Sequence, residues 1–179
     1  MNRSIPLLPI NLLPVVLLFL LGFPIATECA DLIEKTCKKT PHHDLCVSSL
    51  QSSNQSSRAD VKGLASIMAN ITLSNATDTL SYIQLLINQT TDSDLERRLD
   101  YCGEVYIQVV EYILPQAIDA LVKGQYGFAD YGMSDAGSET DSCQDKISKF
   151  KLPVTDRNKL VHDLAEVTEA ICKILLKGG

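Results

Sequence analysis

Positive charge is scarce in this chain of 179 residues. Sixteen lysines and arginines face 22 aspartates and glutamates, which leaves a formal net charge of −6. No basic run is available to neutralise phosphates, which argues against a nucleic-acid partner. A mildly acidic protein stays soluble and suits a partner with a basic surface.

Signatures of catalysis are lacking as well. No serine lies in a nucleophile-elbow pattern, and no glycine-rich loop is built to hold phosphate. His162 beside Asp163 does not form a triad, because adjacent helical residues point in different directions. Two carboxylate pairs could suggest glycoside hydrolysis, but on amphipathic helices such residues are usually solvated charges; they are Glu104 with Glu111 and Glu166 with Glu169. We predict that the protein is not an enzyme.

Only three histidines are present, and two of them lie together. His42 and His43 fall between Cys37 and Cys46, but this spacing matches no common zinc pattern. Thiols in the secretory route tend to oxidise instead of binding metal. We predict no metal and no other cofactor.

The N-terminus has the features of a targeting segment. Arg3 supplies an early positive charge, no further charge follows until Glu28, and an apolar run covers residues 12–21. We predict a signal peptide over residues 1–30, cleaved after Cys29 or Ala30. An uncleaved membrane anchor is the alternative, which the prolines of this stretch disfavour. The remaining domain, residues 31–179, keeps the charge of −6 because Arg3 and Glu28 cancel.

Six cysteines are present, at Cys29, Cys37, Cys46, Cys102, Cys143 and Cys172. In a secreted protein they are expected to pair, and loss of Cys29 would leave five and hence one free thiol. Cys37 and Cys46 flank the Thr40-Pro41 turn and could close a small hairpin. Cys172 is predicted to be a buried, inert thiol.

Four Asn-x-Ser/Thr triplets are candidate glycosylation sites: Asn54, Asn70, Asn75 and Asn88. Asn54 is the preferred candidate, because it lies in a serine-rich stretch over residues 52–57 that we predict to be a polar linker.

Apolar residues recur at helical spacing in four segments after two short helical segments at 31–39 and 44–51, and no stretch alternates as a strand does. The first segment follows Asp60, and a shift in its stripe predicts a kink or a broad apolar face. The second follows Ser93 or Asp94, continues through a kink at Pro115 and ends at Gly124. The stripes are Val61, Leu64, Met68, Ile71, Ala76, Leu80, Ile83 and Ile87; Leu95, Leu99, Cys102, Tyr106, Val109 and Ile113; Ala129, Met133, Ala136, Thr140, Cys143, Ile147 and Phe150; and Leu160, Leu164, Val167, Ile171 and Leu175.

This pattern predicts an all-α protein, an up-down-up-down four-helix bundle. Cys102 and Cys143 fall on the apolar stripes of the second and third segments, so both would face the interior within reach of a disulfide. Such a bridge closes a loop of about 42 residues and is worth roughly 4 kcal/mol in the chain-entropy model.

Three stretches resemble a known family. Residues 32–41, closed by Asp44-Leu45-Cys46, are similar to the start of mature plant invertase inhibitors. Residues 99–106, Leu-Asp-Tyr-Cys-Gly-Glu-Val-Tyr, resemble the motif around the third cysteine of the plant invertase/pectin methylesterase inhibitors. Residues 128–134, followed by Cys143, resemble the stretch before the fourth cysteine.

The resemblance implies a four-helix bundle with an N-terminal helical hairpin extension and the disulfides Cys37–Cys46 and Cys102–Cys143. It implies a secreted inhibitor that covers its target's active site in a one-to-one complex, in the apoplast or cell wall, with the vacuole as the alternative. The Thr-Cys-Lys-x-Thr-Pro start and the Phe-Ala-x-x-Gly-Met stretch favour acid invertase as the target, and pectin methylesterase is the alternative. Fold alone does not decide between them.

One departure from the family concerns the inhibitory loop. Cell-wall invertase inhibitors carry Pro-Lys-Phe there, whereas this chain has Tyr126, Gly127 and Phe128. Lys123 is the candidate replacement for the missing lysine. We expect residues 123–128 to form the inhibitory wedge, with Tyr126 and Phe128 as aromatic anchors. The alternative is that Phe128 caps the bundle end and only Tyr126 is exposed.

Overall fold

The computed structural model describes residues 24–178. Residues 1–23, which hold most of the predicted signal peptide, lie outside this description, as does the side chain of Cys29. The signal peptide and its cleavage site therefore stay predictions.

The described residues form helices joined by short connections, with no strand among them. The prediction of an all-α protein is confirmed. The elements are α2 (Pro24–Cys37), α3 (His43–Gln51), the short 3₁₀ helix η2 (Asn54–Arg58), α4 (Val61–Gln89), α5 (Ser93–Gln108), the π-helical η3 (Val109–Ile113), α6 (Leu114–Val122), α7 (Tyr126–Ile147) and α8 (Val154–Leu176).

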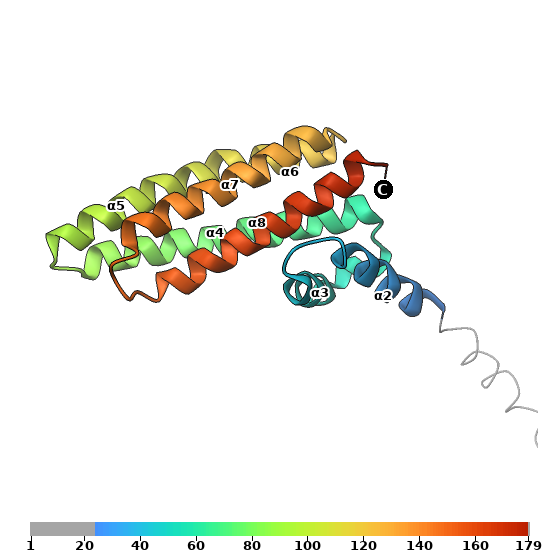
Figure 1. Cartoon of the computed structure of the whole chain (residues 1–179), viewed down its shortest axis with the longest axis horizontal. Helices are drawn as coiled ribbons and strands as arrows, with labels where there is room; N and C mark the ends of the chain where they lie inside the picture. Colours follow the sequence, from blue (N-terminus) through green and yellow to red (C-terminus); the bar gives the residue numbers. More distant parts are fainter. Residues whose placement is uncertain (1–23, 179) are drawn as a thin grey trace, which may run out of the picture.

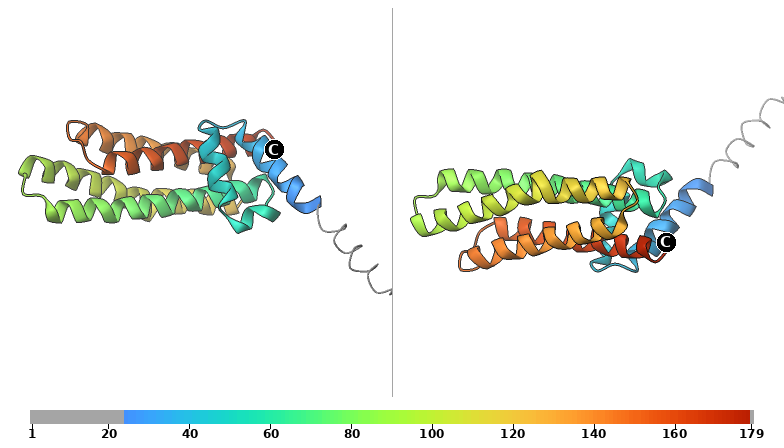
Figure 2. Two further views of the ribbon diagram at one scale, coloured as in Figure 1. Left: turned by 90° about the horizontal axis from the view of Figure 1, so that it is seen from below. Right: turned by 90° about the horizontal axis from the view of Figure 1, so that it is seen from above.

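The long helices form a bundle of four antiparallel helical rods, whose arrangement Figure 1 shows. The rods are α4, the continuous α5–η3–α6, α7 and α8, and each packs against two neighbours around one core. The hairpin of α2 and α3 packs on α4 and α8 at one end of the bundle (Figure 2). The predicted bundle with an N-terminal hairpin extension is confirmed, and the same end holds the α6–α7 connection and the C-terminus of α8 (Figure 1).

The first long helix, α4, has the broad apolar face, and not the kink, of the two alternatives that its shifted stripe allowed. Helix α4 runs unbroken over 29 residues and buries a broad face that includes the polar Thr72 and Thr79. It therefore has a broad apolar face and no break. As predicted, Asp60 caps its start, accepting a hydrogen bond from the Gly63 N–H at 2.7 Å.

The second rod passes through Pro115 without ending, as predicted. Five residues before α6 adopt the wider π-helical turn, in which the Leu114 N–H bonds to the Val109 carbonyl. Proline lacks an N–H and its ring clashes with the carbonyl four residues earlier, and a π-turn relieves both problems. The helix is capped by Asp92, whose Oδ1 accepts from the Asp94 N–H at 2.9 Å, so the predicted cap was placed one or two residues too late.

One apolar position of the predicted stripes was wrong. Leu160 is exposed, because the inward side of α8 passes through Asn158, Val161 and Leu164. The predicted polar linker joins α3 to α4 and contains the short helix η2, capped by Ser53, whose Oγ accepts from the Gln55 N–H at 3.3 Å.

Both disulfides are present, as predicted. Cys37–Cys46 closes the N-terminal hairpin with a Cα–Cα distance of 5.6 Å, and Cys102–Cys143 joins α5 to α7 at 4.8 Å. All four residues are fully buried. The second bridge therefore fixes the two rods from inside the core.

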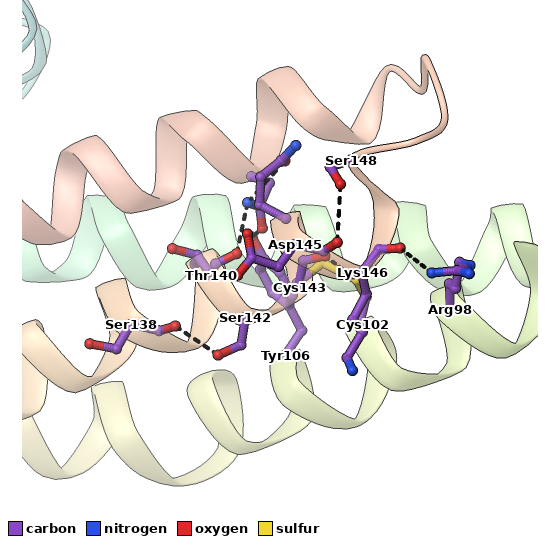
Figure 3. The surroundings of a disulfide bond; sticks show 12 residues. Arg98, Cys102, Tyr106, Ser138, Thr140, Ser142, Cys143, Asp145, Lys146 and Ser148 are labelled. Carbon is purple, nitrogen blue, oxygen red and sulfur yellow. Dashed lines mark hydrogen bonds between the residues drawn. A yellow bond between two sulfur atoms is a disulfide. The ribbon is translucent and has the colours of Figure 1, made fainter.

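A buried polar network lies beside the second disulfide, where Figure 3 shows Tyr106 and Thr140 near Cys102 and Cys143. The Tyr106 hydroxyl donates to Asn158 Oδ1, and Asn158 Nδ2 donates to the Thr140 carbonyl, each at 2.9 Å. Burial raises the pKa of the Tyr106 hydroxyl, so it stays a neutral donor. The network joins α5, α7 and α8 and satisfies groups that would be costly to bury alone.

One helical run of the described residues, Ser93–Val122, is long and apolar enough to cross a membrane. This run is the second rod, whose apolar stripe packs into the bundle core. Core helices of soluble proteins pass the same test.

Candidate functional site

A tight connection of three residues, Lys123 to Gln125, joins α6 to α7. The Gly124 N–H donates to the Leu121 carbonyl at 3.1 Å, and the Gln125 N–H donates to the Ala120 carbonyl at 2.8 Å. Gly124 has a φ of +73°, which glycine adopts without strain. This Schellman motif leaves the connection little freedom.

The predicted inhibitory residues are largely helical. Tyr126, Gly127 and Phe128 form the first turn of α7, so only Lys123 to Gln125 are loop. The main-chain N–H groups of this first turn have no side-chain cap, and the turn has no acidic residue. The positive end of the α7 dipole therefore faces solvent at this tip.

Three large hydrophobic residues are exposed near the tip, Val122 at the end of α6 and Phe128 and Tyr131 on α7, and the two aromatic residues form one apolar surface. The side chains of Val122, Phe128 and Tyr131 are 64%, 73% and 71% exposed, the highest values among the large hydrophobic residues that the structure describes. Tyr126 is half-buried and packs against the core. The alternative in which Phe128 caps the bundle and only Tyr126 is exposed is therefore wrong.

Tyr131 was missed by the sequence analysis. It lies three residues after Phe128, so both project from one face of α7. Both line an open groove of about 610 Å³ between α6 and α7, which Asp119 and Asp135 also line. The spacing from Phe128, opposite the buried stripe of Ala129 and Met133, was the signal available in the sequence.

Gly132 allows α6 and α7 to approach closely beneath this surface. A Cβ added at Gly132 would lie 2.8 Å from the Ala117 Cβ and 3.6 Å from its Cα. Contacts this short force the helices apart, because neither atom can rotate away. Gly132 therefore sets the separation of α6 and α7 under the Phe128 and Tyr131 side chains.

We expect Gly132→Ala to destabilise the protein by about 1–3 kcal/mol through overpacking. Gly103→Ala is the matched control, because the nearest atom to its added Cβ is 3.7 Å away. At that helical position alanine should stabilise by about 0.5–1 kcal/mol. Urea unfolding of the two variants checks this, and equal effects of the same sign would contradict the close approach.

Lys123 is the positively charged residue of the connection that precedes Phe128. Its Nζ lies 2.6 Å from Asp119 Oδ2, and both side chains are more than half exposed. Ion pairs this exposed contribute little to stability. Lys123 can thus exchange Asp119 for a carboxylate on a partner.

Asp130 lies on the opposite side of α7. Its Oδ1 is buried without a hydrogen bond in the described structure, 4.0 Å from the Lys173 Nζ. Desolvation raises the pKa of this carboxyl, Lys173 opposes the shift and Glu169 adds to it. A pKa raised by folding means that the folded state binds the proton more tightly than the unfolded chain. The stabilisation is present in acid and is lost as the pH rises through the folded pKa.

We therefore expect Asp130→Asn to gain stability relative to the wild type as the pH rises from about 3 to 7. Asp145→Asn is the control, since Asp145 is exposed on the same helix and loses the same charge. Chemical unfolding at both pH values measures the effect. A gain shared by both variants would show that it is a net-charge effect and would overturn the assignment to Asp130.

Cys172 is fully buried and unpaired, as predicted. Burial, helped by Asp130 and Glu169, raises the pKa of its thiol to about 12. Nucleophilic thiol chemistry needs the thiolate. Cys172 therefore belongs to the core and not to a reactive site.

The candidate glycosylation sites stay predictions. Asn54, Asn70 and Asn88 are exposed, whereas Asn75 is half-buried. Asn70 and Asn75 each donate through Nδ2 to a backbone carbonyl one helical turn earlier, at 2.7 and 2.8 Å. Asn54 and Asn88 have no such bond among the described contacts.

Comparison with known proteins places this geometry in a family. The profile of the plant invertase/pectin methylesterase inhibitors matches residues 31–172. The chain is 38% identical over 140 residues to "Cell wall / vacuolar inhibitor of fructosidase 1" of Arabidopsis thaliana, covering 78% of this chain and 67% of that protein. It is 30% identical over 159 residues to "Putative invertase inhibitor" of Platanus acerifolia, covering 84% and 88%.

Other relatives carry the second target's name. The chain is 32% identical over 145 residues to "Pectinesterase inhibitor" of Actinidia deliciosa, covering 81% of this chain and 76% of that one. A crystal structure of a mutant pectin methylesterase inhibitor from Arabidopsis shares the fold, with a TM-score of 0.69 at 22% identity, over 77% of this chain and 93% of that one. This chain belongs to the plant invertase/pectin methylesterase inhibitor family.

Proposed function

We propose that this protein inhibits plant acid invertase, blocking sucrose hydrolysis by occluding the active site in a one-to-one complex. The observation that carries the proposal is the pair of exposed aromatic residues, Phe128 and Tyr131, that line one groove beside the α6–α7 connection. Two relatives named as inhibitors of fructosidase, 38% and 35% identical, support invertase as the target.

The tip suits insertion into a pocket. Exposed aromatic side chains that become buried often dominate the energy of an interface. The Schellman motif at Gly124 and the helical first turn of α7 fix the backbone that carries Phe128 before binding. Preorganisation lowers the entropic cost of association.

Electrostatics supplies a replacement for the missing lysine of Pro-Lys-Phe. Glycoside hydrolases use a pair of carboxyl groups at the scissile bond. Lys123, which pairs with Asp119 in the free protein, lies in the connection before α7, and the N-terminus of α7 has no side-chain cap. A helix N-terminus and a nearby ammonium group favour carboxylates.

Pectin methylesterase is the second candidate target, favoured by the pectinesterase inhibitor of Actinidia deliciosa at 32% identity. In either case the chain acts as a binding protein and performs no turnover. We place it in the apoplast or cell wall, with the vacuole as the alternative, in keeping with relatives named cell wall / vacuolar inhibitors.

A paired titration tests the proposal. Purified, oxidised residues 31–179 are titrated at acidic pH against an acid invertase and, separately, a pectin methylesterase. We expect loss of sucrose hydrolysis with the esterase unaffected. Loss of esterase activity alone would move the protein to the second target, and no inhibition of either enzyme would refute the proposal.

A further inference from the structure

Four potential metal ligands meet where the N-terminal hairpin lies against α8. His42 is the residue before α3, and His162, Asp163 and Glu166 belong to consecutive turns of α8. We call these four residues the His42 cluster. His42 has a left-handed backbone, with a φ of 52°. The cluster is outside the α6–α7 tip and has no part in the proposed inhibition.

Ligand atoms of His42, Asp163 and Glu166 lie within 4.8 Å of one another, and a nitrogen of His162 lies next to both carboxylates. His42 Nε2 lies 2.8 Å from Glu166 Oε2 and 3.6 Å from Asp163 Oδ1. His162 Nδ1 lies 3.5 Å from Asp163 Oδ1 and 3.7 Å from Glu166 Oε2. Ligands of a tetrahedral zinc ion with bonds of 2.0–2.1 Å are roughly 3.3 Å apart. The four imidazole–carboxylate contacts are close to that value, whereas the group of His42, Asp163 and Glu166 extends to 4.8 Å, so its side chains must turn inward to hold one ion.

Two of the four residues, His162 and Asp163, also contact a charged side chain outside the cluster. Asp141 Oδ2 lies 3.5 Å from His162 Nε2, so the ring nitrogen that faces away from the cluster has a carboxylate beside it. Lys159 Nζ lies 2.5 Å from Asp163 Oδ2, which leaves Oδ1 directed to the cluster. Such second contacts orient metal ligands and set the histidine tautomer.

Charge and access are also suitable. With neutral imidazoles, the carboxylates of Asp141, Asp163 and Glu166 contribute −3 and Lys159 contributes +1, a net local charge of −2. The side chains of the His42 cluster are between 15% and 41% exposed, so an ion can enter without unfolding the hairpin. Polar residues of α7, Ser134 and Ser138, line a small hollow of about 200 Å³ beside His162.

We propose that the His42 cluster binds one zinc-class divalent ion through two imidazole nitrogens and two carboxylate oxygens, fastening the N-terminal hairpin to α8. Imidazole with carboxylate is a donor set that suits zinc. Calcium and magnesium prefer oxygen ligands alone and are disfavoured here. The site differs from the cysteine–histidine arrangement dismissed from the sequence, because Cys37 and Cys46 are disulfide-bonded and the partners of His42 come from α8.

Isothermal titration tests the site on the untagged, oxidised domain of residues 31–179, stripped of metal and titrated with zinc chloride at pH 7. We expect one ion per chain. His42→Ala and the near-isosteric Glu166→Gln should each weaken binding at least about tenfold. His43→Ala is the matched control: it removes a neighbouring imidazole whose contacts are Glu34 and Asp44, and it should leave the affinity unchanged.

Amide hydrogen exchange in the N-terminal hairpin is a second measurement, which zinc bound elsewhere on the surface would not change. Zinc should slow amide exchange in residues 42–46 of the wild type and of His43→Ala, but not of His42→Ala. Circular dichroism identifies any variant that fails to fold, and Glu166→Gln then carries the test. Absence of zinc binding, affinity unchanged by both cluster variants, or an equal loss in His43→Ala would each overturn the proposal and leave the cluster as a set of ion pairs.

Discussion

Removing the Cys102–Cys143 disulfide is expected to lower the free energy of unfolding by about 4 kcal/mol, because the bridge closes a loop of 41 residues in sequence separation. The bridge joins α5 to α7 in the core, and its sulfurs are fully buried. In a domain of this size the loss corresponds to a fall in melting temperature of about 8–16 °C. Urea unfolding of the Cys102→Ala, Cys143→Ala double variant measures it.

The disulfide variants should be made in a parent protein that has no other free cysteine. A lone remaining cysteine could pair with Cys172, so both members are changed together and the parent carries Cys172→Ala. Removing Cys37 and Cys46 by the same double substitution is the comparison. Their separation of nine residues predicts a smaller loss, about 2.7 kcal/mol. An equal or larger loss from the hairpin bridge would contradict the loop-length account.

Replacing Phe128 by alanine is expected to weaken inhibition of invertase by about 30-fold or more, the equivalent of a hot spot worth about 2 kcal/mol. Phe128 is 73% exposed in the free protein, so its loss should leave the free energy of unfolding within about 0.5 kcal/mol of the wild type. The inhibition constant and the unfolding curve are measured on the same preparation.

Phe128→Ala alone is a sharper test than a joint change with Tyr126. Tyr126 is half-buried against the core, and its removal would mix lost stability with lost binding. Tyr112→Ala is the matched control, because Tyr112 is a 54% exposed aromatic residue on the π-helical η3 that does not line the groove of Phe128 and Tyr131. Inhibition unchanged by Phe128→Ala, or weakened equally by Tyr112→Ala, would remove Phe128 from the interface.

Much of the fold could be predicted because burial leaves a periodic trace in the sequence. The stripes that place Cys102 and Cys143 inside also predict their disulfide, and the cap at Asp60 follows from local hydrogen bonding. The assignment fails at Leu160, where an apolar side chain lies one position outside the buried side of α8. The apolar character of Leu160 does not reveal whether that position lies on the buried or the exposed side of α8.

The candidate site was predictable only in part. Phe128 was identified through the family resemblance. That it lies in a helix and not in a loop depends on the Schellman motif at Gly124, after which α7 begins at Tyr126. Because α7 begins there, Tyr131 lies on the same helical face as Phe128. The His42 cluster was not predictable, since His42 and Glu166 are 124 residues apart and meet through tertiary packing.

Occlusion of the invertase active site by the α6–α7 tip is the central feature of the proposed function. The most direct test is to titrate invertase with the protein at several sucrose concentrations and to measure both the equivalence point and the apparent inhibition constant. Occlusion predicts equivalence at one inhibitor per active site and an apparent inhibition constant that rises linearly with the sucrose concentration. An apparent constant that does not change with sucrose would contradict it.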